Sequence, residues 1–514
     1  MDQSKYKIIL LIIAVGCLIS LTANRKACAD ELEKPVIKLP QVNITGKGEA
    51  DDNFPDSGII SADTVAQSSL NDIPPDKDET QGFLSSSYGS FDSKLFELEH
   101  SMKSDTFYYN ADIKFEKSAG DRENSQFTTY RPNLTVGIPF YAENELIVKI
   151  DYFDKKMGLP GKTDMPTLSS DRGSSDMFSS FSLAHKAGDI SLKAEPYYGV
   201  SIFNDYLIRE DFKNKVVGLK LEAANELLSL EMDAYHNKLV SHYDYGIWRA
   251  NLRTMPLDLT DRWQTIVGIN AFAQEKFGQS PSPFIELVFE ENDDCLHKFT
   301  LTREFDPVLF NKTYLEDNYL EVNPQEMRPV RNSEISYNLD KHISSQWRAN
   351  FLVYYSQKKD SWFLADNDND GFYAPVSMQK VDFSGIKVST EYNWSEEFNY
   401  FLSLDVRKIR SKDSEYEFVP FEPKQKISVG LTYQMNENTK IDFVGDYSGR
   451  RYYSVSSKQS SSAYFLLGSK LTYNLKDYLT FFALVDNLLN DHYDVVRGYP
   501  NQSRSVLSGV TVRF

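Results

Sequence analysis

The last nine residues of the chain alternate between two sets of side chains. One set is apolar apart from a single serine and consists of Val506, Ser508, Val510, Val512 and Phe514. The intervening set consists of Leu507, Gly509, Thr511 and Arg513. A period of two residues predicts a β-strand with one face against an apolar medium and the other against wetter surroundings. We therefore expect the sequence to end in a strand that closes a sheet against lipid.

The same alternation recurs from Gln81 onward. Examples are residues 107–116, 146–152, 347–355 and 427–433. In the first of these segments, the set opposite the apolar residues includes Asp112, Lys114 and Glu116. Charged side chains are costly against lipid, so this face is expected to line a wet lumen. The 31 Tyr and 33 Phe of the chain also suit strands whose ends carry aromatic girdles.

Short turns alternate with longer loops, such as residues 158–175 and 360–375, which is typical of outer-membrane barrels. From Gln81 to Phe514 we count about 22 strands, which leaves room for membrane-crossing strands of about 9–11 residues. A soluble propeller or sandwich would need shorter strands or a repeat of fixed length, and no such repeat is present. The predicted fold class is all-β: a transmembrane antiparallel β-barrel of about 22 strands after a short, mostly irregular leader.

Residues 1–29 are predicted to be a secretory signal peptide. Lys5 and Lys7 precede an apolar core, and residues 27–29 form an A-x-A cleavage site. A permanent N-terminal anchor is the alternative, although the apolar core is short for a membrane helix. Removal of the signal would leave Cys295 as the single cysteine, which permits no internal disulfide. The net charge of −18 argues against nucleic acid as a partner, because phosphate binding needs a basic face.

Several stretches of residues 81–514 resemble the barrel of TonB-dependent receptors. The closing part reads DNLLNDHY and then GYPNQSRSVLSGVTVRF, QGFLSSSYGSFDSK is similar to the family's first barrel strand, and DYFDKKMGLPG resembles a strand ending in Gly-Leu-Pro-Gly. The resemblance implies a multi-pass β-barrel in the outer membrane of a bacterial cell, in contact with outer-membrane lipid. It also implies that the barrel-assembly machinery recognises the C-terminal strand with Val510, Val512 and Phe514.

Residues 30–80 form an acidic leader, expected to lie in the periplasm, that resembles the entrance of the same receptors. The TonB-box candidate consists of Val42, Asn43, Ile44 and Thr45. The TonB energy-transducing protein would capture such a box as an added strand, and an apolar patch in an irregular leader is the alternative. Residues 57–73 resemble the first strand and helix of the plug domain, yet the first barrel strand is expected to begin at Gln81. We therefore expect only a plug remnant, with most of the plug missing.

The loop DNDNDGFY carries the sharpest local motif. Asp366, Asp368 and Asp370, followed by Gly371, match the first half of a calcium-binding loop. The position of the closing glutamate is Ser377, so the motif is incomplete. An Asn/Asp/Gly-rich turn is the favoured interpretation, with calcium as the alternative cofactor.

The sequence contains no G-x-S-x-G, H-E-x-x-H or P-loop motif, and the seven histidines are scattered singly. We therefore expect no enzymatic activity. The predicted function is transport of a small-molecule solute through the barrel, either passively as in a porin or gated by loops. One alternative is a TonB-energised receptor for a chelated metal, cobalamin or glycan. The other is a structural or adhesive surface barrel that binds a partner through its long loops.

Overall fold

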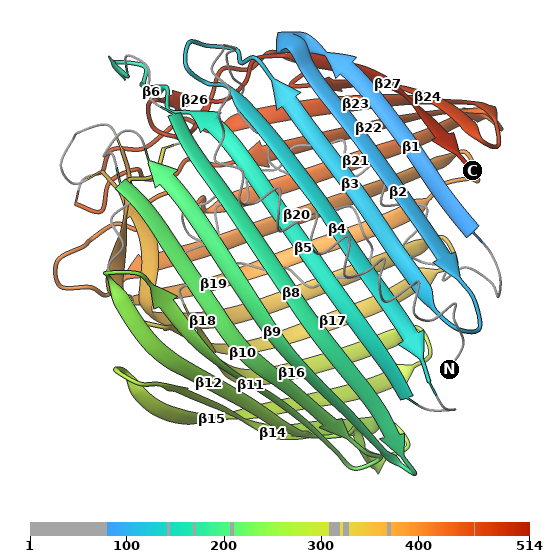
Figure 1. Cartoon of the computed structure of the whole chain (residues 1–514), viewed down its shortest axis with the longest axis vertical. Coiled ribbons are helices and arrows are strands. Elements are labelled where there is room, and N and C mark those ends of the chain that lie inside the picture. The colour runs from blue at the N-terminus through green and yellow to red at the C-terminus, as the bar shows by residue number, and fades with distance from the viewer. Residues whose placement is uncertain are drawn as a thin grey trace, which may run out of the picture. The chain divides into compact units, whose positions relative to one another are not determined.

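The computed structural model describes residues 80–140, 144–167, 171–205, 210–307, 319–321, 328–366, 372–456 and 458–514. The signal, the leader and the TonB-box candidate therefore lie outside the described residues. Almost all of the described secondary structure is β-strand (Figure 1). Within this part of the chain, no helix is long and apolar enough to cross a membrane.

The strands follow one another in chain order. Those of the first half are β1 (Thr80–Gly89), β2 (Ser93–Lys103), β3 (Tyr108–Ser118), β4 (Phe127–Pro139), β5 (Asn144–Gly158), β8 (Asp171–Ala187), β9 (Ile190–Asp205), β10 (Glu210–Ala224), β11 (Leu228–Leu239), β12 (Tyr243–Thr254) and β13 (Leu257–Thr260). Those of the second half are β14 (Trp263–Gln274), β15 (Gly278–Asn292), β16 (Cys295–Asp306), β17 (Val330–Ser344), β18 (Trp347–Ala365), β19 (Ala374–Asn393), β20 (Phe398–Ser411), β21 (Gln425–Asn436), β22 (Thr439–Ser448), β23 (Tyr464–Lys476), β24 (Leu479–Asp486) and β27 (Ser505–Arg513).

Three further elements lie in connections. The 3₁₀ turn η1 (Ser90–Asp92) joins β1 to β2, and two small hairpins sit in loops: β6 (Gly161–Lys162) with β7 (Met165–Pro166), and β25 (Asp494–Val496) with β26 (Tyr499–Pro500).

The sheet is closed. β1 pairs antiparallel with β2 on one side and with β27 on the other, from Phe83 opposite Arg513 to Gly89 opposite Leu507. β12 and β13 both pair with β14 and form one interrupted strand, because Pro256 lacks the N–H that the ladder needs. The 23 strands of the sheet therefore make a wall of 22 positions. The predicted all-β barrel of about 22 strands is confirmed.

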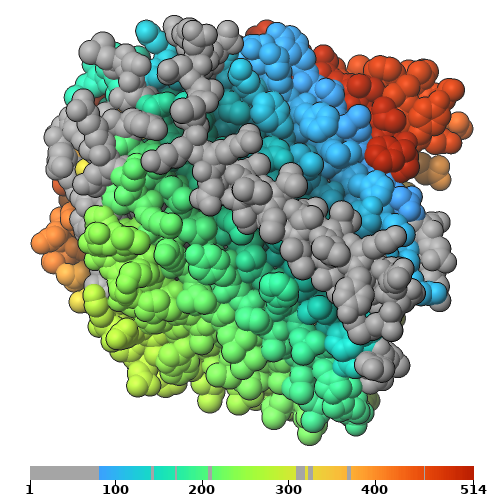
Figure 2. Space-filling view, viewed as in Figure 1, coloured from blue at the N-terminus to red at the C-terminus, as the bar shows by residue number. Residues whose placement is uncertain are grey.

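The two faces of the wall differ as the alternation predicted. Leu84 is 37% exposed on the outer face, whereas its neighbour Phe83 is 5% exposed on the lumen side. Exposed apolar residues of the same kind recur around the barrel, among them Phe181, Val217, Ile269, Ile335, Ile386, Leu402 and Val506. The lumen face instead carries paired charges, such as Lys298 with Glu286 at 2.6 Å. Figure 2 shows the outer surface of the first half of the barrel (blue to green).

The barrel has a short-turn end and a long-loop end. At the short-turn end, successive strands are joined by connections such as residues 188–189, 261–262 and 477–478. The long-loop end carries the connections 159–170, 307–329, 412–424, 449–463 and 487–504. Paired aromatic rings mark the short-turn end: Trp263 stacks on Phe289 at 4.6 Å, and Phe398 stacks on Tyr433 at 4.3 Å. Such rings are typical of the girdle where a barrel meets lipid headgroups.

A charged side chain should destabilise the barrel more on its outer face than on its lumen face. Leu402 lies on the outer face of β20 between Thr390 and Val429, and Ser403 points to the opposite face. We expect Leu402→Arg to lower the free energy of unfolding in lipid vesicles by about 2–4 kcal/mol, because the cation would enter hydrocarbon. Ser403→Arg is the matched control and should cost much less. Equal losses in denaturant titrations would contradict this assignment of faces.

Candidate functional site

Loops from distant parts of the wall meet at the long-loop end. The β6–β7 hairpin touches the β25–β26 hairpin, where the Thr163 N–H donates to the Gly498 carbonyl at 2.9 Å. Tyr373, after β18, donates its Oη–H to the Arg497 carbonyl at 3.1 Å. We call the group of Lys162, Asp366, Tyr373, Arg497 and Tyr499 the mouth junction. Its members come from three loops that leave the wall after β5, β18 and β24.

A buried ion pair joins two of these loops. The Lys162 ammonium pairs with the Asp366 carboxylate, and their side chains are only 13% and 7% exposed. The same ammonium lies 5.2 Å from the centre of the Tyr373 ring. Lys162 therefore contacts both a carboxylate and an aromatic face, which together offset the cost of partly burying the cation.

Tyr373 connects the mouth junction to a fourth loop. Its backbone N–H donates to the Tyr319 carbonyl at 2.9 Å, and its carbonyl accepts from the Glu321 N–H at 2.9 Å. The residue is 1% exposed, and burial raises the pKa of its hydroxyl, with the nearby Asp366 charge adding to the effect. Tyr373 therefore stays neutral and keeps its hydroxyl as a donor to Arg497.

Gly498 allows the two hairpins to approach closely. Its φ of +80° lies in the region that favours glycine, and a Cβ there would come within 2.7 Å of Lys162 Cγ. Its N–H donates to Asp494 Oδ2 at 3.0 Å, which fixes the turn between β25 and β26. A side chain at position 498 would push Lys162 away from Asp366.

The connection between β3 and β4 adds a second cation. The Arg122 guanidinium lies 5.6 Å from the centre of the Tyr499 ring, and its Nη1 donates to the Gly161 carbonyl at 3.3 Å. Burial lowers the pKa of Arg122 and raises the pKa of the adjacent Asp121 carboxyl. The charge of each group partly offsets the shift of the other, so this cation and anion support each other beside the mouth junction.

The wall provides an anchor for the incoming loops. Arg172, on β8, pairs with Asp205 at 2.7 Å and donates to the Leu320 carbonyl at 2.7 Å. The Arg172 and Asp205 side chains are 0% and 1% exposed. The guanidinium also lies 5.1 Å from the centre of the Phe203 ring. Leu320 is thereby held against the lumen side of the wall, where it is fully buried.

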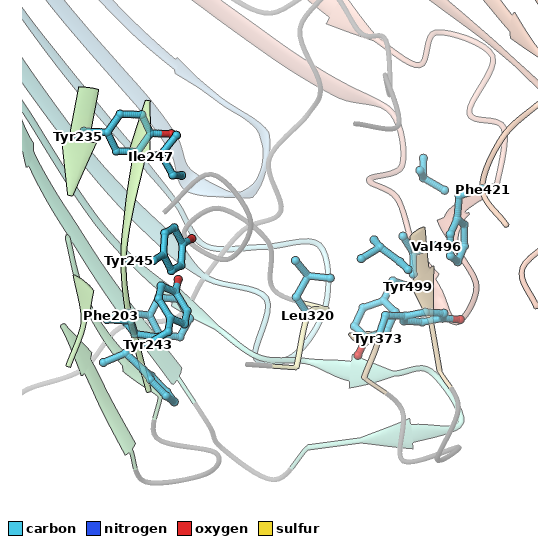
Figure 3. Packing of buried hydrophobic residues seen from close by; sticks show 14 of the residues in the cluster. Phe203, Tyr235, Tyr243, Tyr245, Ile247, Leu320, Tyr373, Phe421, Val496 and Tyr499 are labelled. Carbon is cyan, nitrogen blue, oxygen red and sulfur yellow. The ribbon is translucent and has the colours of Figure 1, made fainter. Parts of the chain in front are cut away.

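One apolar cluster spans the lumen at this end. Figure 3 shows Leu320 between a wall group that includes Phe203 and Tyr243 and a loop group that includes Tyr373 and Tyr499. The wall group extends to β12, and the loop group includes Tyr499, which lies after β24. These strands are opposite each other in the 22-position wall. The described loop segments therefore form a bridge across the mouth of the barrel.

The structure places the predicted site residues in three ways. Asp366 lies in the mouth junction, where Lys162 competes with any cation for its carboxylate. Asp368 and Asp370, like the TonB-box candidate, fall outside the described residues, so the calcium prediction stays a prediction. Val510, Val512 and Phe514 lie in the closing seam with β1. Val510 pairs with Ser86, Val512 pairs with Leu84, and the Phe514 N–H donates to the Gly82 carbonyl at 2.9 Å.

Sequence reasoning did not find the mouth junction. Residues 158–175 and 360–375 were predicted to be long loops, but no pattern in them predicted that they contact each other. The available signals were local: a Gly-Leu-Pro-Gly turn at residues 158–161 and a Gly-Tyr-Pro turn at residues 498–500. The contacts between these turns depend on the closure of the whole barrel, which no local pattern encodes.

Comparisons with known proteins agree with this architecture. A family model described as "TonB dependent receptor-like, beta-barrel" matches residues 43–488. No curated protein sequence matches. Among solved structures, the copper transporter OprC is 13% identical with a TM-score of 0.67, covering 85% of this chain and 80% of that chain.

Two further structures are similar to the same extent. The ferric enterobactin receptor PfeA from Pseudomonas aeruginosa is 12% identical with a TM-score of 0.69, covering 85% of this chain and 81% of that chain. The siderophore receptor PirA from Acinetobacter baumannii is 10% identical with a TM-score of 0.69, again covering 85% and 81%. At these identities the likeness establishes the fold.

The Arg172 anchor should hold the Leu320 segment in place. We expect Arg172→Met to leave the Asp205 carboxylate buried without this cation, at a cost of about 3–5 kcal/mol. Hydrogen exchange at the Glu321 and Tyr373 amides should then accelerate. Arg172→Met combined with Asp205→Leu is the control. The double variant also removes the buried Asp205 charge and should recover part of the lost stability. Unchanged exchange in the single variant would show that this pair does not anchor the loop.

Proposed function

The chain belongs to the TonB-dependent receptor β-barrel family, and from this premise we propose that it transports a solute across the outer membrane through a barrel gated by its loops. In this proposal the mouth junction blocks the lumen, as a plug domain would. Passage requires the Lys162–Asp366 pair and the Tyr373–Arg497 hydrogen bond to part. The residues before β1 then need not fill the lumen.

The bridge across the mouth is the observation that carries this proposal. A barrel of about 22 strands has a wide lumen that must be filled or closed if it is not to leak. The mouth junction joins three loops, and the Arg172 anchor ties a fourth to the wall. A bridge of this kind is a bistable element, since its contacts break together when the loops separate.

The names of the structural relatives give first candidates for the solute. One is a copper transporter and two are receptors for ferric enterobactin or a siderophore. Metal ions and metal chelates are therefore the first solutes to assay. The polar lumen face, with pairs such as Lys298 and Glu286, would favour a hydrophilic cargo.

A TonB-energised receptor is the second candidate, favoured by the family assignment itself. Pulling on a TonB box does work only if the box is attached to something that blocks the barrel. In the energised case the blocking element is in the leader, and in the loop-gated case it is the mouth junction. The two candidates therefore predict different effects of weakening the mouth junction and of deleting the leader.

Weakening the mouth junction should open the barrel. In planar bilayers we expect the unaltered protein to show mainly closed states and Lys162→Gln with Tyr373→Phe to open more often. Each loss of about 1.4 kcal/mol from the closed state raises the ratio of open to closed roughly tenfold. Single-channel recording measures this ratio directly.

Arg348→Gln provides the matched control. Arg348 pairs with Asp340 at 2.5 Å at the short-turn end, away from the mouth junction. The Arg348→Gln substitution also removes one ion pair, but it should leave the open-to-closed ratio unchanged. A steady large conductance in the unaltered protein, or equal effects of the two sets of substitutions, would refute gating by these loops.

Deleting residues 30–79 tests the leader. We expect the deletion to leave the single-channel conductance close to that of the full chain, because the loops and not the leader close the barrel. Deleting residues 42–45 alone should likewise leave solute uptake by cells unchanged. A large rise in conductance in the first case, or loss of uptake in the second, would favour the energised receptor.

A further inference from the structure

The β15–β16 hairpin gathers three metal-ligating side chains far from the mouth junction. They are Glu291, Cys295 and His297, and their ligand atoms all lie within 4.8 Å of one another. Among the described residues, Cys295 is the free cysteine, and it is buried. The hairpin turn belongs to the short-turn end of the barrel.

The distances within the group fit a tetrahedral metal site. Cys295 Sγ lies 3.6 Å from His297 Nε2, which in turn lies 3.4 Å from Glu291 Oε2. Zinc binds thiolate at about 2.3 Å, imidazole at about 2.0–2.1 Å and carboxylate at about 2.0–2.2 Å. At a tetrahedral angle these lengths place sulfur roughly 3.6 Å from nitrogen, and nitrogen roughly 3.4 Å from oxygen. The observed separations match both values.

Glu291 lies at a β-bulge beside this group. The ladder between β15 and β16 pairs Glu290 with Leu296 and then Asn292 with Cys295, so Glu291 is the extra residue of the bulge. Phe289, two residues before Glu291, pairs with His297, so strand alternation places the Glu291 carboxylate on the face that carries His297 and Cys295.

The imidazole is already oriented to bind through Nε2. Its Nδ1 lies 2.9 Å from Tyr337 Oη on the neighbouring strand, and its ring lies 5.4 Å from the ring of Phe289. A metal-bound histidine keeps its other ring nitrogen protonated and donates that proton to an outer partner. Tyr337 Oη stands where this partner is needed.

Access to the group comes from the turn. Cys295 is 4% exposed, whereas the Glu291 side chain is 55% exposed and the His297 side chain 20%. A cation would enter past the carboxylate and meet the sulfur last. Lys341, which pairs with Cys295 in the ladder, is a competing cation on the neighbouring strand.

We propose that Glu291, Cys295 and His297 bind a borderline-soft divalent cation of the zinc type. The thiolate and imidazole select against calcium and magnesium, which prefer oxygen ligands. Three protein ligands leave the fourth position of the tetrahedron to water. Binding releases the thiol proton to solvent. The bound cation then links β15 and β16, in addition to the turn that already connects them. The site does not depend on the proposed transport function.

Cobalt substitution tests the site in the full chain in detergent. We expect Co²⁺ to give thiolate-to-metal charge-transfer absorption, and Zn²⁺ to displace it and to slow maleimide labelling of Cys295. Cys295→Ser should abolish the absorption. His297→Ala and Glu291→Gln should each weaken binding at least tenfold, and Tyr337→Phe roughly tenfold through its effect on the imidazole.

His236→Ala is the matched control, because His236 also pairs with a carboxylate, Asp244, at 2.5 Å but has no cysteine beside it. This variant should bind Co²⁺ as the unaltered protein does. Absence of charge-transfer absorption would overturn the proposal and leave the group as a hydrogen-bonded turn. Absorption that persists in both His297→Ala and Glu291→Gln would also overturn it, since it would mean binding by the thiol alone.

Discussion

Backbone hydrogen bonding in lipid is the constraint on which the rest of the structure depends. Hydrocarbon offers no partner for an unpaired N–H or C=O, so a sheet that crosses it must close. Here the closure rests on the ladder between β1 and β27, where Leu84 pairs with Val512 and Ser86 pairs with Val510. The outward apolar residues, the charged lumen and the short turns at one end all follow from placing a closed sheet in a membrane.

A closed wall of this size creates a second demand. The lumen is too wide for the side chains of the wall to fill, so something else must limit passage. In the proposed function, that limit comes from the loops that meet at the mouth junction. Their contacts are polar and charged at the centre, with aromatic rings around them. Lys162 contacts Asp366 and the Tyr373 ring, and Arg122 lies against Tyr499. The aromatic rings exclude water and so strengthen the charge contacts that they surround.

The division between what the sequence predicted and what it did not has a physical basis. Strand alternation is a local property, so the barrel, its faces and its approximate strand number could be predicted from segments such as residues 107–116. The mouth junction joins residues 162, 366 and 497, whose proximity depends on the closure of the whole ring. The cluster around Cys295 was not predicted because Glu291, Cys295 and His297 meet only when the β15–β16 hairpin folds back on itself, and their spacing in the sequence matches no metal-binding motif.

The strength of the mouth junction is what would make it a gate. A hydrogen bond contributes about 0.5–1.5 kcal/mol net, because opening exchanges it for bonds to water. The hydrogen bonds of Tyr373 with Arg497 and of Thr163 with Gly498, together with the ion pair of Lys162 and Asp366, therefore sum to a few kcal/mol. A closed state favoured by that amount is dominant but reversible. A solute that binds the open state more tightly than the closed state by a similar free energy would shift the population toward the open state. The apolar cluster through Leu320 adds to this free energy wherever opening separates its loop group from its wall group.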